Sequence, residues 1–172
     1  MRKFFLTVIA LIAISSTCFA AREVRVSDYT ISEFYNVYNN VAINVIKNNL
    51  SFKEAPTHVL SNENYDTYMT GCGPEGHGVI VSFFNNKQGH ISKIMLVVNG
   101  NDQIASKCAA GVLVNVLATF GLNAQEVEYF VKNLKSGSIR RYCQNPQRYI
   151  DVNISGDKKA GLIYMRFTAL VD

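Results

Sequence analysis

The chain has 172 residues, of which 48% are hydrophobic and 17% charged, and its formal net charge at pH 7 is +4. This composition excludes a disordered or low-complexity protein, and the length suits one domain with its own core. The densest basic cluster is only Arg140 and Arg141 with Arg148 nearby, so we expect no nucleic-acid partner.

The first twenty residues have the three parts of a secretory signal peptide. Arg2 and Lys3 form a positive segment, an apolar run covers residues 4–14, and small residues lead to a cleavage site. The run is too short to cross a bilayer comfortably. We expect cleavage between Ala20 and Ala21 and bacterial-type export to the periplasm or the medium. We expect residues 21–172 to form a single domain without a transmembrane segment.

A helix is predicted directly after the expected leader. Thr30 and Glu33 form a capping box, in which each side chain bonds to the other residue's backbone N–H group. The helix is expected over residues 31–47. Its apolar side carries Ile31, Phe34, Tyr35, Tyr38, Val41, Ala42, Val45 and Ile46. Short strands are expected at 58–60 and 65–70, on either side of turn-forming residues.

A glycine-rich loop at 71–78 leads into a β-hairpin. The two arms, 78–84 and 91–98, flank the turn at 85–89. Both faces of each arm are apolar: Val79, Val81 and Phe83 alternate with Ile80 and Phe84, and Ile94, Leu96 and Val98 with Met95 and Val97. Such a hairpin is either covered on both faces or presents one of them to a partner.

The longest helical pattern follows the hairpin. Apolar residues recur at steps of three and four over 104–120, with Asp102 as N-cap and Gly121 as the stop signal. Asn123 and Glu126 then form the capping box of a second helix that runs to about residue 134.

Three extended segments complete the chain at 139–143, 149–155 and 161–171, the last two with alternating apolar residues. We therefore expect an α+β domain with helices on one face of a mostly antiparallel sheet. Each half has a helical part, an extended segment ending in cysteine, a turn with proline, and a hairpin. The similarity of the two halves indicates either an α-β-β-β pseudo-repeat or a chance likeness, because this order of elements is common in α+β domains.

The glycine-rich loop is the one stretch where reactive side chains crowd together. Cys72, Glu75 and His77 could serve as nucleophile, orienting group and base of a thiol enzyme. A metal site could be considered at Cys72, His77 and His90, with Glu75 or His58 as a fourth ligand. The close ligand pairs typical of zinc sites are missing, so we expect no metal and no cofactor.

Three cysteines remain after removal of Cys18: Cys72, Cys108 and Cys143. An oxidising compartment favours one disulfide and one leftover thiol, and spacing alone leaves three pairings open. Cys72 and Cys143 each follow an extended segment and precede a turn, whereas Cys108 lies on the apolar stripe of a helix. We therefore predict a Cys72–Cys143 disulfide.

The leading functional hypothesis is an exported, non-enzymatic protein that binds another protein or an envelope component, such as an inhibitor, immunity factor or envelope accessory. Its binding residues are expected on the second hairpin face: Ile80, Phe84, Met95 and Val97. The helix at 31–47 should cover this face in part and leave a patch for the partner. The alternatives are a thiol-dependent hydrolase at Cys72, Glu75 and His77, and a subunit of a surface assembly, which needs an open sheet edge.

Overall fold

The computed structural model describes residues 25–134 and 137–170. The expected signal peptide and its cleavage site between Ala20 and Ala21 lie outside these residues. In chain order the described elements are α2 (Ile31–Asn40), the π-helix η2 (Val41–Val45), β1 (Thr57–Ser61), β2 (Tyr65–Cys72), β3 (Val79–Asn86), β4 (Ile91–Asn99), α3 (Gln103–Thr119), α4 (Ala124–Lys132), β5 (Gly137–Cys143), β6 (Arg148–Asp157) and β7 (Leu162–Leu170).

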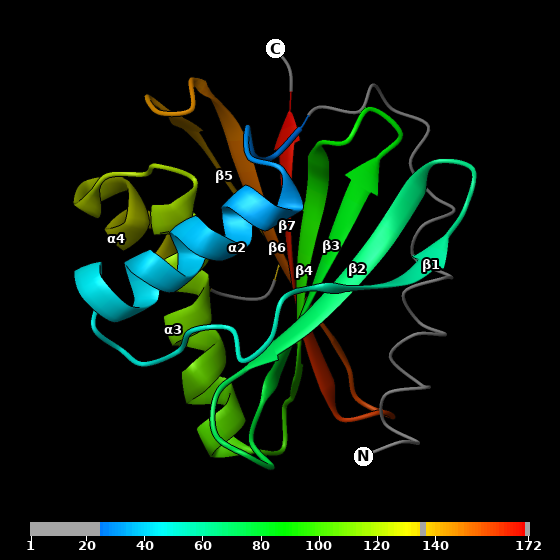
Figure 1. Ribbon diagram of the computed structural model, residues 1–172. Helices are drawn as coiled ribbons and strands as arrows, with labels where there is room; N and C mark the ends of the chain where they lie inside the picture. The colour runs from blue at the N-terminus through cyan, green and yellow to red at the C-terminus, as the bar shows by residue number, and fades with distance from the viewer. Residues whose placement is uncertain (1–24, 135–136, 171–172) are drawn as a thin grey trace.

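The strands form one sheet in the order β1-β2-β3-β4-β7-β6-β5. Every neighbouring pair is antiparallel, and the helices lie together on one side of the sheet (Figure 1). The expected α+β arrangement is confirmed. β1 and β5 are the two edge strands.

Each half of the chain contributes a meander, and the last strands of the two meanders, β4 and β7, pair at the centre of the sheet. The first half has four strands and the second has three, while α3 and α4 both belong to the second half. The halves are therefore unequal, and the α-β-β-β pseudo-repeat stays a prediction.

The main core lies between the sheet and helices α2 and α3. Phe34 of α2 meets Phe83 of β3 with ring centroids 5.5 Å apart, and Phe120 with centroids 5.9 Å apart. All three rings are buried, and each large apolar side chain removed from water contributes about 1.5–3 kcal/mol. Val81 and Phe83 of β3 point into this helix-side core, as do Ile94, Leu96 and Val98 of β4.

The central helix α3 begins and ends as its sequence predicts. The Asp102 carboxylate accepts hydrogen bonds from the N–H groups of Ile104 and Ala105 at 2.9 and 3.0 Å, which satisfies donors that the first helical turn leaves unpaired. Gly121 follows the helix with φ of +89°, a conformation that glycine adopts without steric cost. The capping boxes of α2 and α4 are also present.

The first helix differs from the prediction at its C-terminal end. After Asn40 the chain continues as the π-helix η2, in which the Ile46 N–H group donates to the Val41 carbonyl. The wider turn changes the direction of the side chains that follow. The helical period predicts Val45 and Ile46 on the buried side, but their exposed fractions are 63% and 38%.

The second face of the β3–β4 hairpin lies away from the helices. It carries an outer cluster composed of Tyr65, Met69, Phe84, Met95, Val97 and Leu162, with Val59, Ile80 and Tyr164 packed against it. None of the described helix residues belongs to this cluster. The prediction that the 31–47 helix covers this face is wrong. Phe34 of α2 packs on Phe83. Because consecutive strand residues point to opposite faces of the sheet, Phe84 and the rest of the outer cluster lie on the face away from α2.

Candidate functional site

The glycine-rich loop between β2 and β3 folds against the N-terminal end of α3. Gly73 and Gly76 have φ of +95° and +80°, values that allow the loop to reverse within a few residues. The His77 N–H group donates to the Pro74 carbonyl at 3.1 Å. The loop thereby brings His77 beside Asp102, the N-cap of α3.

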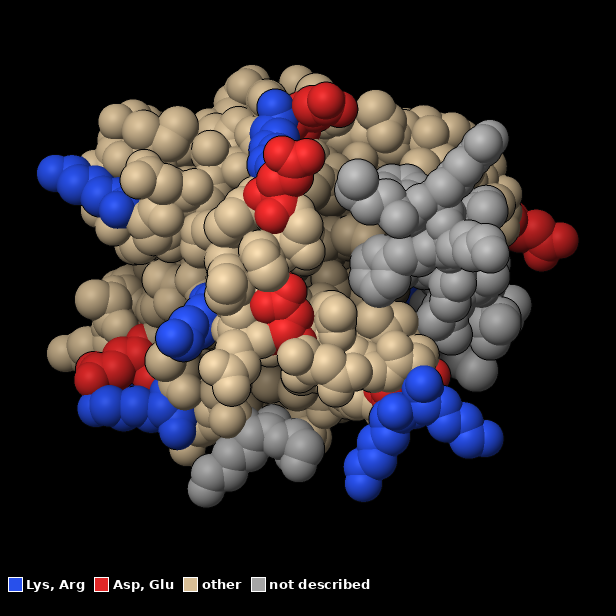
Figure 2. Space-filling model, turned by 90° about the horizontal axis from the view of Figure 1, so that it is seen from below, with Lys and Arg blue, Asp and Glu red and all other residues tan. Residues whose placement is uncertain are grey.

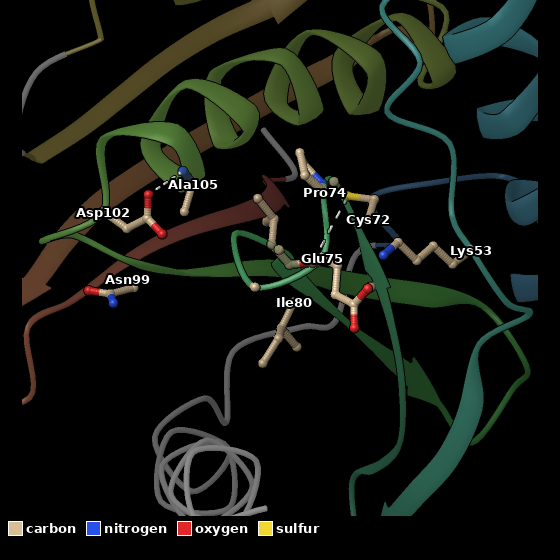
Figure 3. A pocket seen from close by; sticks show the side chains of 13 residues that line it. Lys53, Cys72, Pro74, Glu75, Ile80, Asn99, Asp102 and Ala105 are labelled. Atoms are coloured by element: carbon tan, nitrogen blue, oxygen red, sulfur yellow. Dashed lines mark hydrogen bonds between the residues drawn. The ribbon is translucent and has the colours of Figure 1, made fainter. Parts of the chain in front are cut away.

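A pocket of about 470 Å³ opens between this loop, the end of β4 and the first turn of α3 (Figure 3). Val79, Ile80 and Ala105 supply apolar side chains to its wall. Lys53 and Glu75, both exposed, add charged groups at its margin. The pocket is therefore apolar inside and charged where it meets solvent.

Ile80 connects the pocket with the outer cluster, because it lines the former and packs against the latter. The other three residues of the predicted binding face are buried: Phe84, Met95 and Val97 expose 0%, 6% and 1% of their surface. The structure thus brings the four predicted residues together on one sheet face. Only Ile80, which is half-buried, lines the pocket.

His77 and Asp102 form a close pair at the edge of the site. Nδ1 of His77 lies 2.6 Å from Oδ2 of Asp102. The N–H group of Ala105 and the His77 ring hold the pKa of the Asp102 carboxyl below its usual range. This pairing was not predicted. Asp102 was recognised only as a helix cap, and no spacing rule connects it with a histidine in a distant loop.

Cys72 lies at the opposite end of the loop from this pair. Its thiol is buried, with Sγ 4.0 Å from the Val79 carbonyl oxygen. Burial raises the pKa of the Cys72 thiol to about 12. A nucleophilic cysteine instead needs a lowered pKa, because the thiolate is the reactive form. In the described structure His77 is therefore paired with Asp102 rather than with Cys72. The Cys72 thiol stays protonated near neutral pH because its pKa is raised by burial.

The predicted Cys72–Cys143 disulfide is absent, and Cys72, Cys108 and Cys143 are all free. Cys72 ends β2 and Cys143 ends β5, which stand five positions apart in the sheet. Strand spacing puts them about 24 Å apart across the sheet, whereas a disulfide requires Cα atoms within about 7 Å. The pairing is wrong because the order of the strands was unknown from the sequence.

The histidines considered as metal ligands do not converge. Nε2 of His58 lies 2.9 Å from the Ser61 hydroxyl, on β1 at the sheet edge, and His90 lies in the β3–β4 turn. Within residues 25–134 and 137–170, no group of three or more His, Cys, Asp or Glu side chains is placed to hold a metal ion.

Charges are interspersed on the face shown in Figure 2, where basic and acidic side chains alternate over the surface. No helix in the described part of the chain is long and apolar enough to cross a membrane. No protein-family model matches this chain, and neither the curated proteins nor the solved structures contain a match to it.

Proposed function

We propose that this chain is an exported, non-enzymatic binding protein that acts by contact with another protein. The observation that carries the proposal is the pocket beside the β2–β3 loop, whose apolar wall includes Ile80, one of the residues predicted to bind. Its volume of about 470 Å³ falls within the range of about 300–1,000 Å³ found for ligand pockets.

The partner that fits this site presents a large apolar side chain from an exposed segment. Protein interfaces gain most of their affinity from a few such side chains buried in pockets near the centre of the contact. Phe84, Met95 and Val97 lie behind Ile80 in the outer cluster and hold that wall in place. The charged side chains of Lys53 and Glu75 at the margin would select the residues that flank the inserted side chain.

A site-specific crosslink tests the proposal even though the partner is unidentified. A photo-crosslinking amino acid is placed at Glu75, on the pocket margin, or at Gln88, in the exposed turn at the other end of the β3–β4 hairpin. After irradiation in the native envelope and secreted fractions, mass spectrometry identifies the adducts. We expect one partner from the Glu75 position and none of it from the Gln88 position.

Two substitutions connect that crosslink with the pocket. Ile80→Asn should remove the Glu75 adduct, because it places an amide in the apolar wall. Ile43→Asn is the matched control, since Ile43 lies on η2 and is 50% exposed. An adduct that survives Ile80→Asn in a folded protein, or that forms equally from Gln88, would overturn the proposal.

The His77–Asp102 pair keeps the thiol-enzyme alternative open, because a carboxylate that orients an imidazole is a recurrent part of nucleophilic sites. The two functions differ in the reactivity of Cys72. An enzyme centred on Cys72, Glu75 and His77 requires rapid alkylation of Cys72 by iodoacetamide at neutral pH. Slow alkylation of Cys72, relative to the half-buried Cys108, is the result expected for the binding protein.

A further inference from the structure

Two of the three free cysteines in the described part of the chain lie close to the pocket. Cys72 lines the pocket at the end of β2. Cys108 lies on α3, one helical turn beyond Ala105, which lines the same pocket. In Figure 3 the Cys72 side chain and α3 stand on the same side of the pocket.

The separation of the two chain segments suits a disulfide. A Cβ atom built on Gly73, the residue after Cys72, would lie 3.7 Å from the Cβ atom of Cys108. The two Cβ atoms of a disulfide are about 3.5–4.5 Å apart. Gly71 and Gly73 flank Cys72, and glycine backbones adjust more freely than those of other residues. Cys72 belongs to the helix-side core cluster, and Cys108 packs against the same cluster, so a rotation of the loop about these glycines would carry the Cys72 sulfur toward Cys108.

We propose that Cys72 and Cys108 form a disulfide under oxidising conditions and thereby fasten the β2–β3 loop to α3. The structure with free cysteines is the reduced form of this pair. The proposal goes beyond the binding function and does not depend on it, since it concerns only the chemistry of the chain.

The oxidant is a small disulfide, R–S–S–R, of the kind that supplies oxidising equivalents in exported compartments. The Cys108 thiol loses its proton to solvent, and its thiolate attacks one sulfur of R–S–S–R to give a mixed disulfide. The leaving R–S⁻ takes up a proton. The Cys72 thiolate then attacks the Cys108 sulfur and displaces the second R–S⁻, which is also protonated. Two protein thiols are oxidised and two R–SH molecules are formed.

Exposure and acidity set the order and the speed of these steps. Cys108 is half-buried and Cys72 is buried, so the external disulfide meets Cys108 first. Burial is the main cause that raises the pKa of both thiols. Because the thiolate attacks, the rate of the first step should rise about tenfold per pH unit below the pKa of Cys108, and ring closure by the mostly protonated Cys72 thiol should also be faster at higher pH.

The test treats the folded, reduced chain with oxidised glutathione between about pH 7 and pH 9. Acid stops the reaction, free thiols are alkylated, and the unreduced protein is digested and mapped by mass spectrometry. We expect a linked pair of peptides that contain Cys72 and Cys108, an intact mass lower by two hydrogens, and alkylated Cys143. Cys143 lies in β5, at the far edge of the sheet, so Cys143→Ser should leave the yield of the bond unchanged.

Cys108→Ser should abolish the bond and leave Cys72 unmodified. Cys72→Ser should trap the mixed disulfide on Cys108; if this buried substitution prevents folding, Cys108→Ser and the wild-type map still decide the question. Glutathione that stays on Cys108 of the folded wild-type chain while Cys72 remains free would overturn the proposal. So would a Cys72–Cys108 bond that forms only in denaturant, or one no more frequent than bonds to Cys143.

Discussion

Asn115 joins three segments of the helix layer from a fully buried position on α3. Its Nδ2 atom donates to the Tyr38 hydroxyl of α2 at 3.3 Å and to the Asn48 side-chain oxygen at 3.2 Å. The Asn48 amide donates back to Oδ1 of Asn115 at 2.9 Å. Tyr38 in turn donates to the Leu50 carbonyl at 2.9 Å. The group therefore holds α2 and the segment after η2 against α3.

Asn115→Ala removes three of these hydrogen bonds. Each contributes about 0.5–1.5 kcal/mol net, and a buried group left without a partner costs about 1–3 kcal/mol. Tyr38 retains its bond to Leu50, and the half-buried Asn48 can turn to solvent. We therefore expect the free energy of unfolding to fall by about 2–3 kcal/mol. For a chain of this size, that corresponds to a Tm lower by about 4–12 °C.

Urea unfolding of Asn115→Ala, Asn48→Ala and the double variant measures both the cost and its source. The sum of the losses in unfolding free energy of the two single variants should exceed the loss of the double variant by about 1 kcal/mol, because both changes break the same bonds. Asn44→Ala is the control, since the Asn44–Asn40 bond is exposed, and it should change stability by less than about 0.5 kcal/mol. Strict additivity, or a cost for Asn115→Ala no larger than that of the control, would refute this reasoning.

Three further predictions concern residues at the ends of helices α3 and α4. Asn123→Ala removes the cap of α4 and should lower the free energy of unfolding in urea by about 1 kcal/mol. Gly121→Ala forces a side chain onto a φ of +89° and should cost about 1–2 kcal/mol in the same assay; an unchanged midpoint contradicts it. Asp102→Asn keeps a capping side chain but removes the charge. The Ala105 N–H group lowers the native pKa of Asp102, so the wild type gains stability above the unfolded-state pKa and loses it as pH falls through the native pKa. Between about pH 5 and pH 2 the variant should lose less stability than the wild type, and parallel profiles would count against the assigned pKa.

Local patterns predicted the elements because local physics determines them. The capping side chains of Thr30, Asp102 and Asn123 lie at the helix starts where the sequence indicated them. Two apolar runs around a turn likewise located the hairpin β3–β4, and the alternation of side chains along a strand separated its two faces. These signals depend on residues a few positions apart, so they can be read before the tertiary structure is determined.

The remaining features depend on the relative positions of elements that are distant in sequence. Both faces of the hairpin are apolar, so the pattern could not decide whether α2 packs on Phe83 or on Phe84. The central β4–β7 pairing carries no local signal, and without it the wide separation of Cys72 and Cys143 could not be foreseen. The π-turn after Asn40 is followed by Asn48, which bonds to Asn115 of α3, and the helical period does not encode such a contact between distant segments.

The pairing of β4 with β7 also determines when the sheet can be completed during synthesis. Lys93 pairs with Thr168 and Asn99 with Leu162, so β4 gains its second neighbour only after nearly the whole chain has been made. Until then an eight-residue buried stretch of β4, from residue 91 to residue 98, stands at an open edge, where unpaired backbone groups recruit other strands. Contacts this distant in sequence also form slowly. A chain that ends before β7 should therefore aggregate rather than remain as a smaller folded unit.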